Sequence, residues 1–130
     1  MKLLIDTNVL IWLINDHKSV GPKTLKLLQN TNNEVYLSYF SLFEMKIKSA
    51  AGKSEYNDTI VEDLPKMGVE LVMPDLEVLS KYKIYDQSNK DPFDNMLIAV
   101  AIDHKMTMVT SDNKILELKH DNFTPINSRE

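Results

Sequence analysis

Short apolar runs, rich in β-branched and aromatic residues, alternate with longer stretches of helical periodicity along the whole chain. A helix between two strands returns the chain to the edge where the first strand began, so the two strands run parallel. Such connections are right-handed, and their helices cover both faces of the sheet. We therefore expect a three-layer α/β/α domain over residues 1–130, with a central, mainly parallel sheet of four to five strands. The expected strands cover residues 2–6, 34–38, 69–73, 107–110 and, at an edge, 123–127, and the expected helices cover 9–15, 22–30, 41–52, 54–66, 75–85, 92–104 and 113–118.

Capping and stop signals mark several helix ends. Thr7 or Asn8 is suited to cap the first helix. Ser41 with Glu44 three residues later has the pattern of a capping box, and Gly52 is suited to end the same helix. These signals predict where strands pass into helices, which is where ligands bind in parallel sheets.

The composition excludes several classes of protein. With 43% hydrophobic residues, 130 residues are enough for one domain that buries roughly two thirds of its unfolded surface. The chain has no cysteine, which rules out a disulfide framework, a thiolate zinc site and a cysteine nucleophile. No apolar stretch approaches the roughly 20 residues of a membrane span, so we expect a cytoplasmic protein. Three glycines are too few for a glycine-rich phosphate loop.

Four carboxylates stand where strands give way to helices. They are Asp6 after KLLI, Glu44 in SLFEMKIK, Asp94 in DPFDNMLIA and Asp112 after MVTS. Setting these four aside leaves 15 acidic and 15 basic residues, so they account for the net charge of −4. Because hard cations such as Mg²⁺ and Mn²⁺ prefer carboxylate oxygens, convergence of the four would make a divalent-metal site.

Each of these carboxylates also has a structural explanation. Asp6 and Asp112 are common cap and turn residues, and the capping box accounts for Glu44 without a metal. Asp94 is harder to explain in this way, because it opens an otherwise apolar helix and buried charges are usually paired or metal-bound. At this position we favour ligation.

Other polar residues allow two interpretations each. Lys48 follows Glu44 by four residues, so it forms either a surface ion pair or a phosphate contact beside the metal. Asp91 is suited to cap the helix that contains Asp94. Trp12, among apolar neighbours, is expected to lie partly in the core rather than to dock a partner. The three histidines lack metal-ligand spacing and are expected to be exposed and structural: His17, His104 and His120.

In order and spacing, LLIDTNVLIWLI, SLFEMKIKSAAGK, DPFDNMLIAVAI and MVTSDN resemble the motif blocks of PIN-domain toxins of the VapC type. The resemblance implies a metal-dependent endoribonuclease, the toxin of a type II toxin–antitoxin module, with an RNA substrate, a cognate VapB-type antitoxin and a homodimeric state. It implies a site for Mg²⁺ or Mn²⁺. We expect no association with membranes, because the apolar stretches are too short to span a bilayer. The implied catalytic and metal-binding residues are Asp6, Glu44, Asp94 and Asp112, with Thr7, Asn8, Asp91 and Thr110 in support around them.

The third block departs from the family pattern. It commonly reads H-R-D-P-F-D-R, whereas Asn89, Lys90 and Asn95 stand at its first, second and last positions here. These changes affect residues expected to contact RNA or antitoxin, and they leave all four acidic positions intact. We expect Lys48 and Lys90 to contact the substrate backbone.

In the expected mechanism, one or two cations held by the four acids promote in-line hydrolysis of an RNA phosphodiester. Two other functions fit the sequence. Asp6 after a first strand also suits a phosphohydrolase nucleophile, although IDTN lacks a second aspartate two residues on. The third possibility is a non-catalytic domain whose helices dock another protein.

Overall fold

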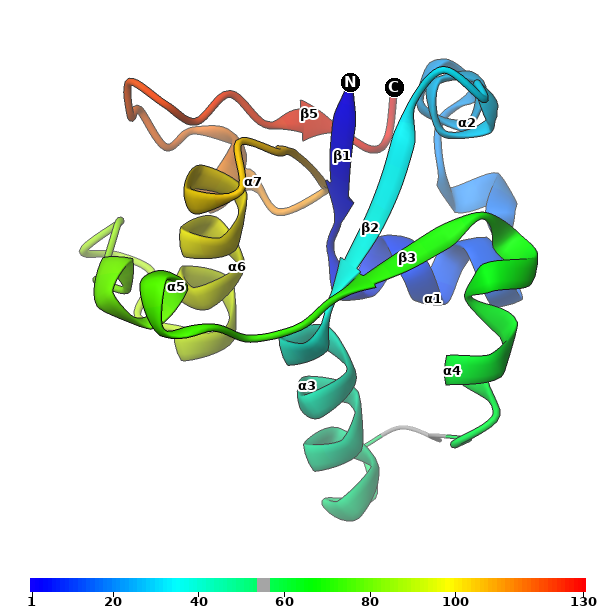
Figure 1. Cartoon of the computed structure of the whole chain (residues 1–130), viewed down its shortest axis with the longest axis horizontal. Coiled ribbons are helices and arrows are strands. Elements are labelled where there is room, and N and C mark those ends of the chain that lie inside the picture. Colours follow the sequence, from blue (N-terminus) through cyan, green and yellow to red (C-terminus); the bar gives the residue numbers. More distant parts are fainter. Residues whose placement is uncertain (54–56) are drawn as a thin grey trace.

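The computed structural model describes residues 1–53 and 57–130. Within these ranges, five strands form one sheet in the order β3-β2-β1-β4-β5, and every neighbouring pair is parallel. The predicted architecture is therefore confirmed, including the edge position of the last strand (Figure 1). The strands are β1 (Lys2–Ile5), β2 (Glu34–Ser38), β3 (Val69–Val72), β4 (Thr107–Thr110) and β5 (Ile126–Asn127).

Helices cover both faces of the sheet. Figure 1 shows α1, α2 and α4 on one side and α5, α6 and α7 on the other. Within the described ranges, none of these helices is long and apolar enough to cross a membrane. The helices are α1 (Thr7–Asn15), α2 (Pro22–Gln29), α3 (Tyr39–Ala50), α4 (Ile60–Asp63), α5 (Leu76–Lys81), α6 (Pro92–Asp103) and α7 (Asn113–Leu116), with 3₁₀ helices η1 (His17–Ser19) and η2 (Pro65–Met67).

Neighbouring residues of β1 point to opposite faces of the sheet and pack in different hydrophobic clusters, because side chains alternate along a strand. Leu3 and Ile5 pack in a cluster with Leu10 of α1, whereas Leu4 packs in a second cluster with Leu97 of α6. All three strand residues are fully buried, which explains why the strand is a continuous apolar run. Trp12 is partly buried against the first cluster, as predicted.

The sheet has a switch point between β1 and β4. From β1 the chain proceeds outward through β2 to β3, and it then returns to the other side of β1 to form β4. At such a point the connections leave in opposite directions and open a crevice at the carboxyl ends of the strands. The residues that follow Ile5 and Thr110 therefore border this crevice.

The first expected helix cap was misplaced by one or two residues. Thr7 and Asn8 lie inside α1, and Asp6 caps it by accepting a hydrogen bond from the Val9 backbone amide at 2.8 Å. The helix begins as soon as β1 ends, so the last position with extended backbone belongs to Asp6.

The predicted capping box was wrong. α3 begins at Tyr39, and its cap is Ser38, whose hydroxyl accepts from the Phe40 amide at 3.1 Å. Ser41 consequently lies within the first turn, and the side chain of Glu44 turns toward other partners, described below. Gly52 was correctly predicted to end this helix, since it follows α3 with a φ of +73°.

Three expected helices are clearly shorter than their patterns, among them α7, which ends at Leu116 instead of Leu118. Of the helix expected over 54–66, the first three positions lie outside the described residues, and the rest contains only α4 and η2. α5 ends at Lys81 instead of Tyr85 because Tyr82 adopts an extended backbone and the Tyr85 hydroxyl donates to the Lys81 carbonyl at 2.8 Å. The polar loop over 86–91 was predicted correctly.

Candidate active site

Asp6 lies at the centre of the carboxyl edge of the sheet. Its backbone amide donates to the Val109 carbonyl at 3.1 Å, which continues the pairing of β1 with β4. One carboxylate oxygen accepts from the Val9 amide, and the other accepts from the Thr110 hydroxyl at 2.5 Å. With 7% of its surface exposed, Asp6 is held rigidly at the floor of the crevice.

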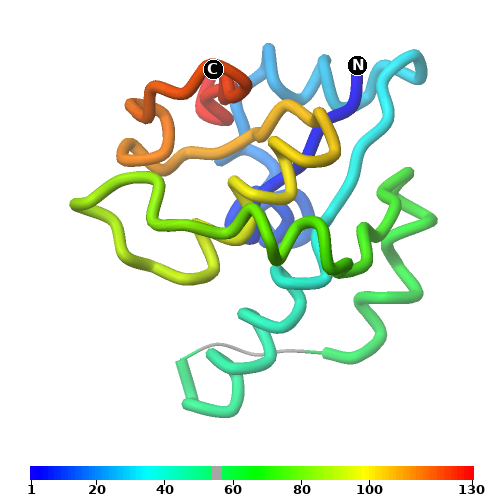
Figure 2. Tube along the Cα trace, turned by 60° about the vertical axis from the view of Figure 1, so that its left-hand side comes forward, coloured from blue at the N-terminus to red at the C-terminus, as the bar shows by residue number. Residues whose placement is uncertain are grey.

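Glu44 reaches the same place from α3, which leaves the carboxyl end of β2 and points away from the sheet (Figure 1, Figure 2). Its Oε1 accepts from the Thr7 hydroxyl at 2.7 Å, and its Oε2 lies 3.1 Å from the Lys48 ammonium. The predicted Glu44–Lys48 pair is thus present. It differs from an ordinary surface pair because Glu44 is buried and only the lysine is exposed.

Asp94 enters from the first turn of α6 and is half-buried. Its Oδ2 accepts from the Asn89 side-chain amide at 2.9 Å. The helix in which it lies is capped by Asp91, whose carboxylate accepts from the amides of Phe93 and Asp94 at 2.8 and 3.3 Å. The predicted cap at Asp91 is therefore present, and it sets the direction in which Asp94 leaves the helix.

Asp112 follows β4 and caps α7. Its Oδ1 accepts from the amides of Lys114 and Ile115 at 2.8 and 3.4 Å. The hydroxyl of Thr110, a fully buried residue, accepts from the Asp112 amide at 3.1 Å while it donates to Asp6. One threonine therefore couples the positions of two carboxylates that belong to neighbouring strands.

The four carboxylates line one small pocket. Its volume is about 40 Å³, enough for a cation with a water molecule and far too small for a nucleotide. Among the described residues, no three of these carboxylates offer oxygens that all lie within 4.8 Å of one another. The lining residues are Asp6, Thr7, Asn8, Glu44, Lys48, Asp94, Leu97 and Asp112.

The pocket penalises negative charge. Burial raises the pKa of Asp6 above its usual value, although hydrogen bonds from Thr110 and Val9 oppose the rise. Burial also raises the pKa of Asp94 to about 6, opposed by the Asn89 hydrogen bond and reinforced by repulsion from neighbouring carboxylates. Burial is thus the main cause of both raised pKa values, and a cation bound beside these carboxylates would favour their ionised forms.

The donor set suits a hard divalent cation. Carboxylate oxygens from four separate segments face a space of ionic size, and no histidine or sulfur atom lines it. The hydrogen bonds of the described residues occupy Asp94 Oδ2 and Asp112 Oδ1, and none of them uses the second oxygen of either carboxylate. The residues present thus fit Mg²⁺ or Mn²⁺.

Not every residue expected at the site lines the pocket. Asp91 and Thr110 lie behind it and hold Asp94 and Asp6, and Lys90 is exposed outside it. Asn89 and Asn95 were considered only as departures that affect contacts to RNA or antitoxin, yet both are buried and connect the loop over 86–91 to α6. An amide inside an otherwise apolar helix was the available signal for Asn95.

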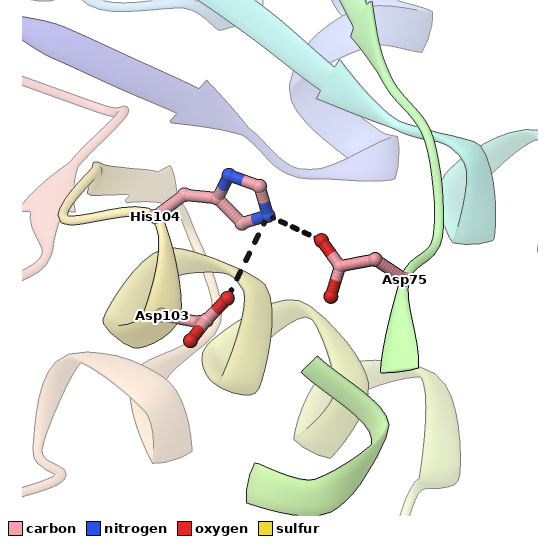
Figure 3. A group of neighbouring side chains, drawn as sticks. All are labelled: Asp75, Asp103 and His104. Atoms are coloured by element: carbon pink, nitrogen blue, oxygen red, sulfur yellow. Dashed lines mark ion pairs between the residues drawn. The ribbon is translucent and has the colours of Figure 1, made fainter. Parts of the chain in front are cut away.

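A tighter group of ligand-type atoms lies elsewhere (Figure 3). The Nε2 atom of His104 is 3.4 Å from Asp75 and 3.9 Å from Asp103, and the three side chains join the start of α5 to the end of α6. The Lys81 ammonium already contacts Asp103 at 2.6 Å, so this carboxylate has its cation. We interpret the group as an ion-pair cluster. Of the three histidines expected to be exposed, His17 is exposed, whereas His104 and His120 are partly buried.

Two larger hollows, of about 520 and 530 Å³, lie away from the four carboxylates. The first is lined mainly by apolar residues of the η2–β3 region, including Leu64, Pro65 and Val69. The second lies beside α2 and β5, with Leu27 and Ile126 in its wall. The two larger hollows are lined mainly by apolar residues, whereas the small pocket brings the four carboxylates together.

Comparison with solved structures agrees with the fold described above. VapBC2 from Rickettsia felis, bound to a DNA fragment from its promoter, has a similar structure with a TM-score of 0.66, 20% identity, and coverage of 96% of this chain and 97% of that chain. VapBC-1 from nontypeable Haemophilus influenzae has a TM-score of 0.62 and 19% identity, with coverage of 96% and 98%. A toxin–antitoxin complex from Klebsiella pneumoniae has a TM-score of 0.60 and 16% identity, with coverage of 94% and 95%. At these identities the similarity establishes the fold.

Among curated proteins, none matches this chain. The family model described as PIN domain matches residues 3–121, which include four of the five strands and all four carboxylates of the pocket. Since this match extends over most of the sequence, the chain belongs to the PIN domain family.

Proposed function

We propose that this protein is a divalent-metal-dependent endoribonuclease that acts as the toxin of a type II toxin–antitoxin module. The observation that carries the proposal is the convergence of Asp6, Glu44, Asp94 and Asp112 on one pocket at the switch point of the sheet. Four carboxylates in a space of ionic size are costly for a folded chain unless a cation binds there. Membership of the PIN domain family supports a nuclease.

In this proposal Asp6, Asp94 and Asp112 hold the cation directly, and Glu44 acts directly or through a water molecule. A divalent cation at this place supplies Lewis-acid activation of water and of the phosphodiester. The Asp6 carboxylate is held in one orientation, because the Val9 amide and the Thr110 hydroxyl each donate a hydrogen bond to one of its oxygens. Asp94 is mostly ionised at neutral pH, since its pKa of about 6 lies below 7.

Lys48 and Thr7 prepare the site for an anionic substrate. The Thr7 hydroxyl holds one oxygen of Glu44, and the exposed Lys48 ammonium holds the other while it lines the pocket. A phosphate that enters the pocket meets this ammonium at the rim. Lys90, on the loop before α6, extends the basic surface available to an RNA backbone. Without the cation, the carboxylates repel the substrate.

The geometry disfavours the two other functions. A phosphoryl acceptor must expose its carboxylate to attack the phosphorus atom, yet Asp6 is only 7% exposed. The residue two positions after it, where such sites have a second aspartate, is Asn8. A domain that served only to dock a partner would gain nothing from placing Asp6 and Glu44 below 10% exposure beside two further carboxylates.

The toxin part of the proposal rests on likeness to proteins that are complexes of a toxin with an antitoxin. We propose a VapB-type antitoxin as the partner of this chain, and a homodimer as its assembly. In support, α3 exposes Tyr39, Phe43 and Ile47 at a spacing of four residues, which places them on one face of the helix. Such a stripe is typical of a surface that contacts another protein.

The test of the catalytic proposal is cleavage of total cellular RNA by the purified protein with Mg²⁺ or Mn²⁺. We expect discrete products that disappear with EDTA and with Asp94→Asn. Asp121→Asn is the matched control, because it removes the same charge from an exposed residue away from the pocket. Cleavage that persists in EDTA or in Asp94→Asn would contradict the proposal. So would the absence of cleavage by a folded protein that binds the metal.

The toxin proposal has its own test in growing cells. Induction of the wild-type protein should arrest growth, Asp94→Asn should not, and co-expression of an antitoxin encoded beside the gene should restore growth. Light scattering of the isolated protein tests the homodimer. Equal growth arrest by wild type and Asp94→Asn would show that toxicity does not depend on the acidic pocket.

A further inference from the structure

Asn89 is a buried polar residue, 9% exposed, in the loop that precedes α6. Its side-chain amide donates to Asp94 Oδ2 at 2.9 Å, and its side-chain oxygen accepts from the Asp91 backbone amide at 3.2 Å. The reverse orientation of the amide would place an oxygen against a carboxylate and an NH₂ group against a backbone N–H. Only the observed orientation pairs both neighbours.

A second asparagine holds the loop that carries Asn89. Asn95, 1% exposed, donates to the carbonyls of Asn89 and Asp91 at 3.3 and 3.0 Å, and it accepts from the Tyr85 amide at 3.0 Å. The loop is thereby fixed to the first turn of α6 at both of its ends. These side-chain hydrogen bonds of Asn95 go to Tyr85, Asn89 and Asp91 and not to the Asp94 carboxylate, so Asn95 acts on the loop.

The partner of Asp94 is neutral, which matters for a cation site. The Asn89 amide fixes one carboxylate oxygen without adding positive charge, and it directs Asp94 Oδ1 away from the hydrogen bond. A lysine in the same place would neutralise the carboxylate, as the Lys81 ammonium does for Asp103. Carboxylates that bind metals depend on hydrogen-bonding partners of this kind for their orientation.

We propose that Asn89 is a positioning residue that orients Asp94 toward the cation and the reacting phosphate, and that Asn95 acts one step further out by holding the loop. This inference rests on the proposed nuclease function and adds a residue to it. Asn89 contributes through the direction of one hydrogen bond, so another side chain with a suitably placed N–H should replace it.

The experiment measures Mn²⁺ affinity by calorimetric titration at pH 7.5, together with kcat and KM for RNA cleavage. For Asn89→Leu we expect Mn²⁺ affinity to fall about 10–100-fold, the range for loss of an outer-sphere partner, with kcat reduced and KM little changed. Asn89→Ala gives the same test if the leucine variant fails to fold. Asn89→His, whose ring N–H can donate, should recover most of the affinity.

The matched control is Asn95→Ser, which loosens the same loop without removing the donor to Asp94. It should lower the melting temperature and change Mn²⁺ affinity by about threefold or less, well under the effect of a lost outer-sphere partner. Ser88→Ala, an exposed change in the same loop, serves if Asn95→Ser does not fold.

Each outcome bears on a different statement. A folded Asn89→Leu protein with wild-type Mn²⁺ affinity and kcat overturns the role of Asn89 and leaves the nuclease proposal standing. Equal losses in Asn95→Ser and Asn89→Leu also overturn it, because the loop alone would then account for the effect. A wild-type protein that binds no Mn²⁺ overturns the proposed function and this inference together.

Discussion

Replacing Asp94 by asparagine should stabilise the metal-free protein at neutral pH while it abolishes metal-dependent activity. The reason is the raised pKa of about 6, against 3.8 for an ordinary aspartate, which arises from burial first and from neighbouring carboxylates. The ionised carboxylate therefore has a higher free energy in the folded chain than in the unfolded one. Asparagine keeps an oxygen that can accept from the Asn89 amide and carries no charge.

The size of the effect follows from the shift. About two pKa units correspond to about 3 kcal/mol at 1.36 kcal/mol per unit, and partial exposure of Asp94 to solvent reduces this to about 1–2 kcal/mol. Because the pKa of Asp94 is raised in the folded protein, the stability difference between Asp94→Asn and wild type depends on pH. Above pH 6 both folded and unfolded chains are ionised and the wild type bears the full cost. Between pH 6 and 4 the folded carboxyl takes up its proton, and the advantage of Asp94→Asn shrinks.

The assay is urea denaturation in EDTA at pH 7.5 and pH 4.5, comparing wild type, Asp94→Asn and the control Asp121→Asn. Asp94→Asn should exceed wild type by about 1–2 kcal/mol at pH 7.5 and by less at pH 4.5, and Asp121→Asn should stay within about 0.5 kcal/mol. Saturating Mn²⁺ should stabilise wild type and leave Asp94→Asn nearly unchanged. The reasoning is refuted if Asp94→Asn is no more stable than wild type at pH 7.5, or if its advantage is independent of pH.

Three further outcomes test the electrostatics of the pocket. Lys48→Met removes the ammonium 3.1 Å from Glu44 and should tighten Mn²⁺ binding about two- to fivefold in calorimetry, as expected for a partly exposed ion pair; unchanged or weaker binding would show that Lys48 does not compete with the cation. Thr110→Val removes the hydroxyl that serves both Asp6 and Asp112 and should cost about 1–3 kcal/mol in urea denaturation; a loss within error would mean that these hydrogen bonds add no net stability. Because Asp94 must lose its proton to bind metal, Mn²⁺ affinity should fall about tenfold for each pH unit below about 6, whereas a flat profile down to pH 5 would exclude Asp94 as a ligand.

Much of the fold was predictable from local pattern. Alternation of apolar runs with helical periodicity identified all five strands, although the last covers only Ile126–Asn127 of the expected 123–127, and Gly52 marked a helix end that the structure reproduces. Helix starts were harder, because serine, threonine and aspartate all serve as caps and several occur in succession. The choice of Asp6 over Thr7, and of Ser38 over Ser41, was made by the point at which each strand ends in the sheet.

For the site, the sequence by itself determined which chemical groups are available: four carboxylates on separate segments of the chain, no cysteine, and no glycine-rich loop. Only the tertiary structure decided that these carboxylates share one pocket, because that depends on the return of β4 to the side of β1 opposite β2. It also decided the partners of each group. The hydrogen bonds Thr7–Glu44, Thr110–Asp6 and Asn89–Asp94 orient the three carboxylates. The first two join residues 37 and 104 positions apart, and a local pattern in the sequence carries no information about such distances.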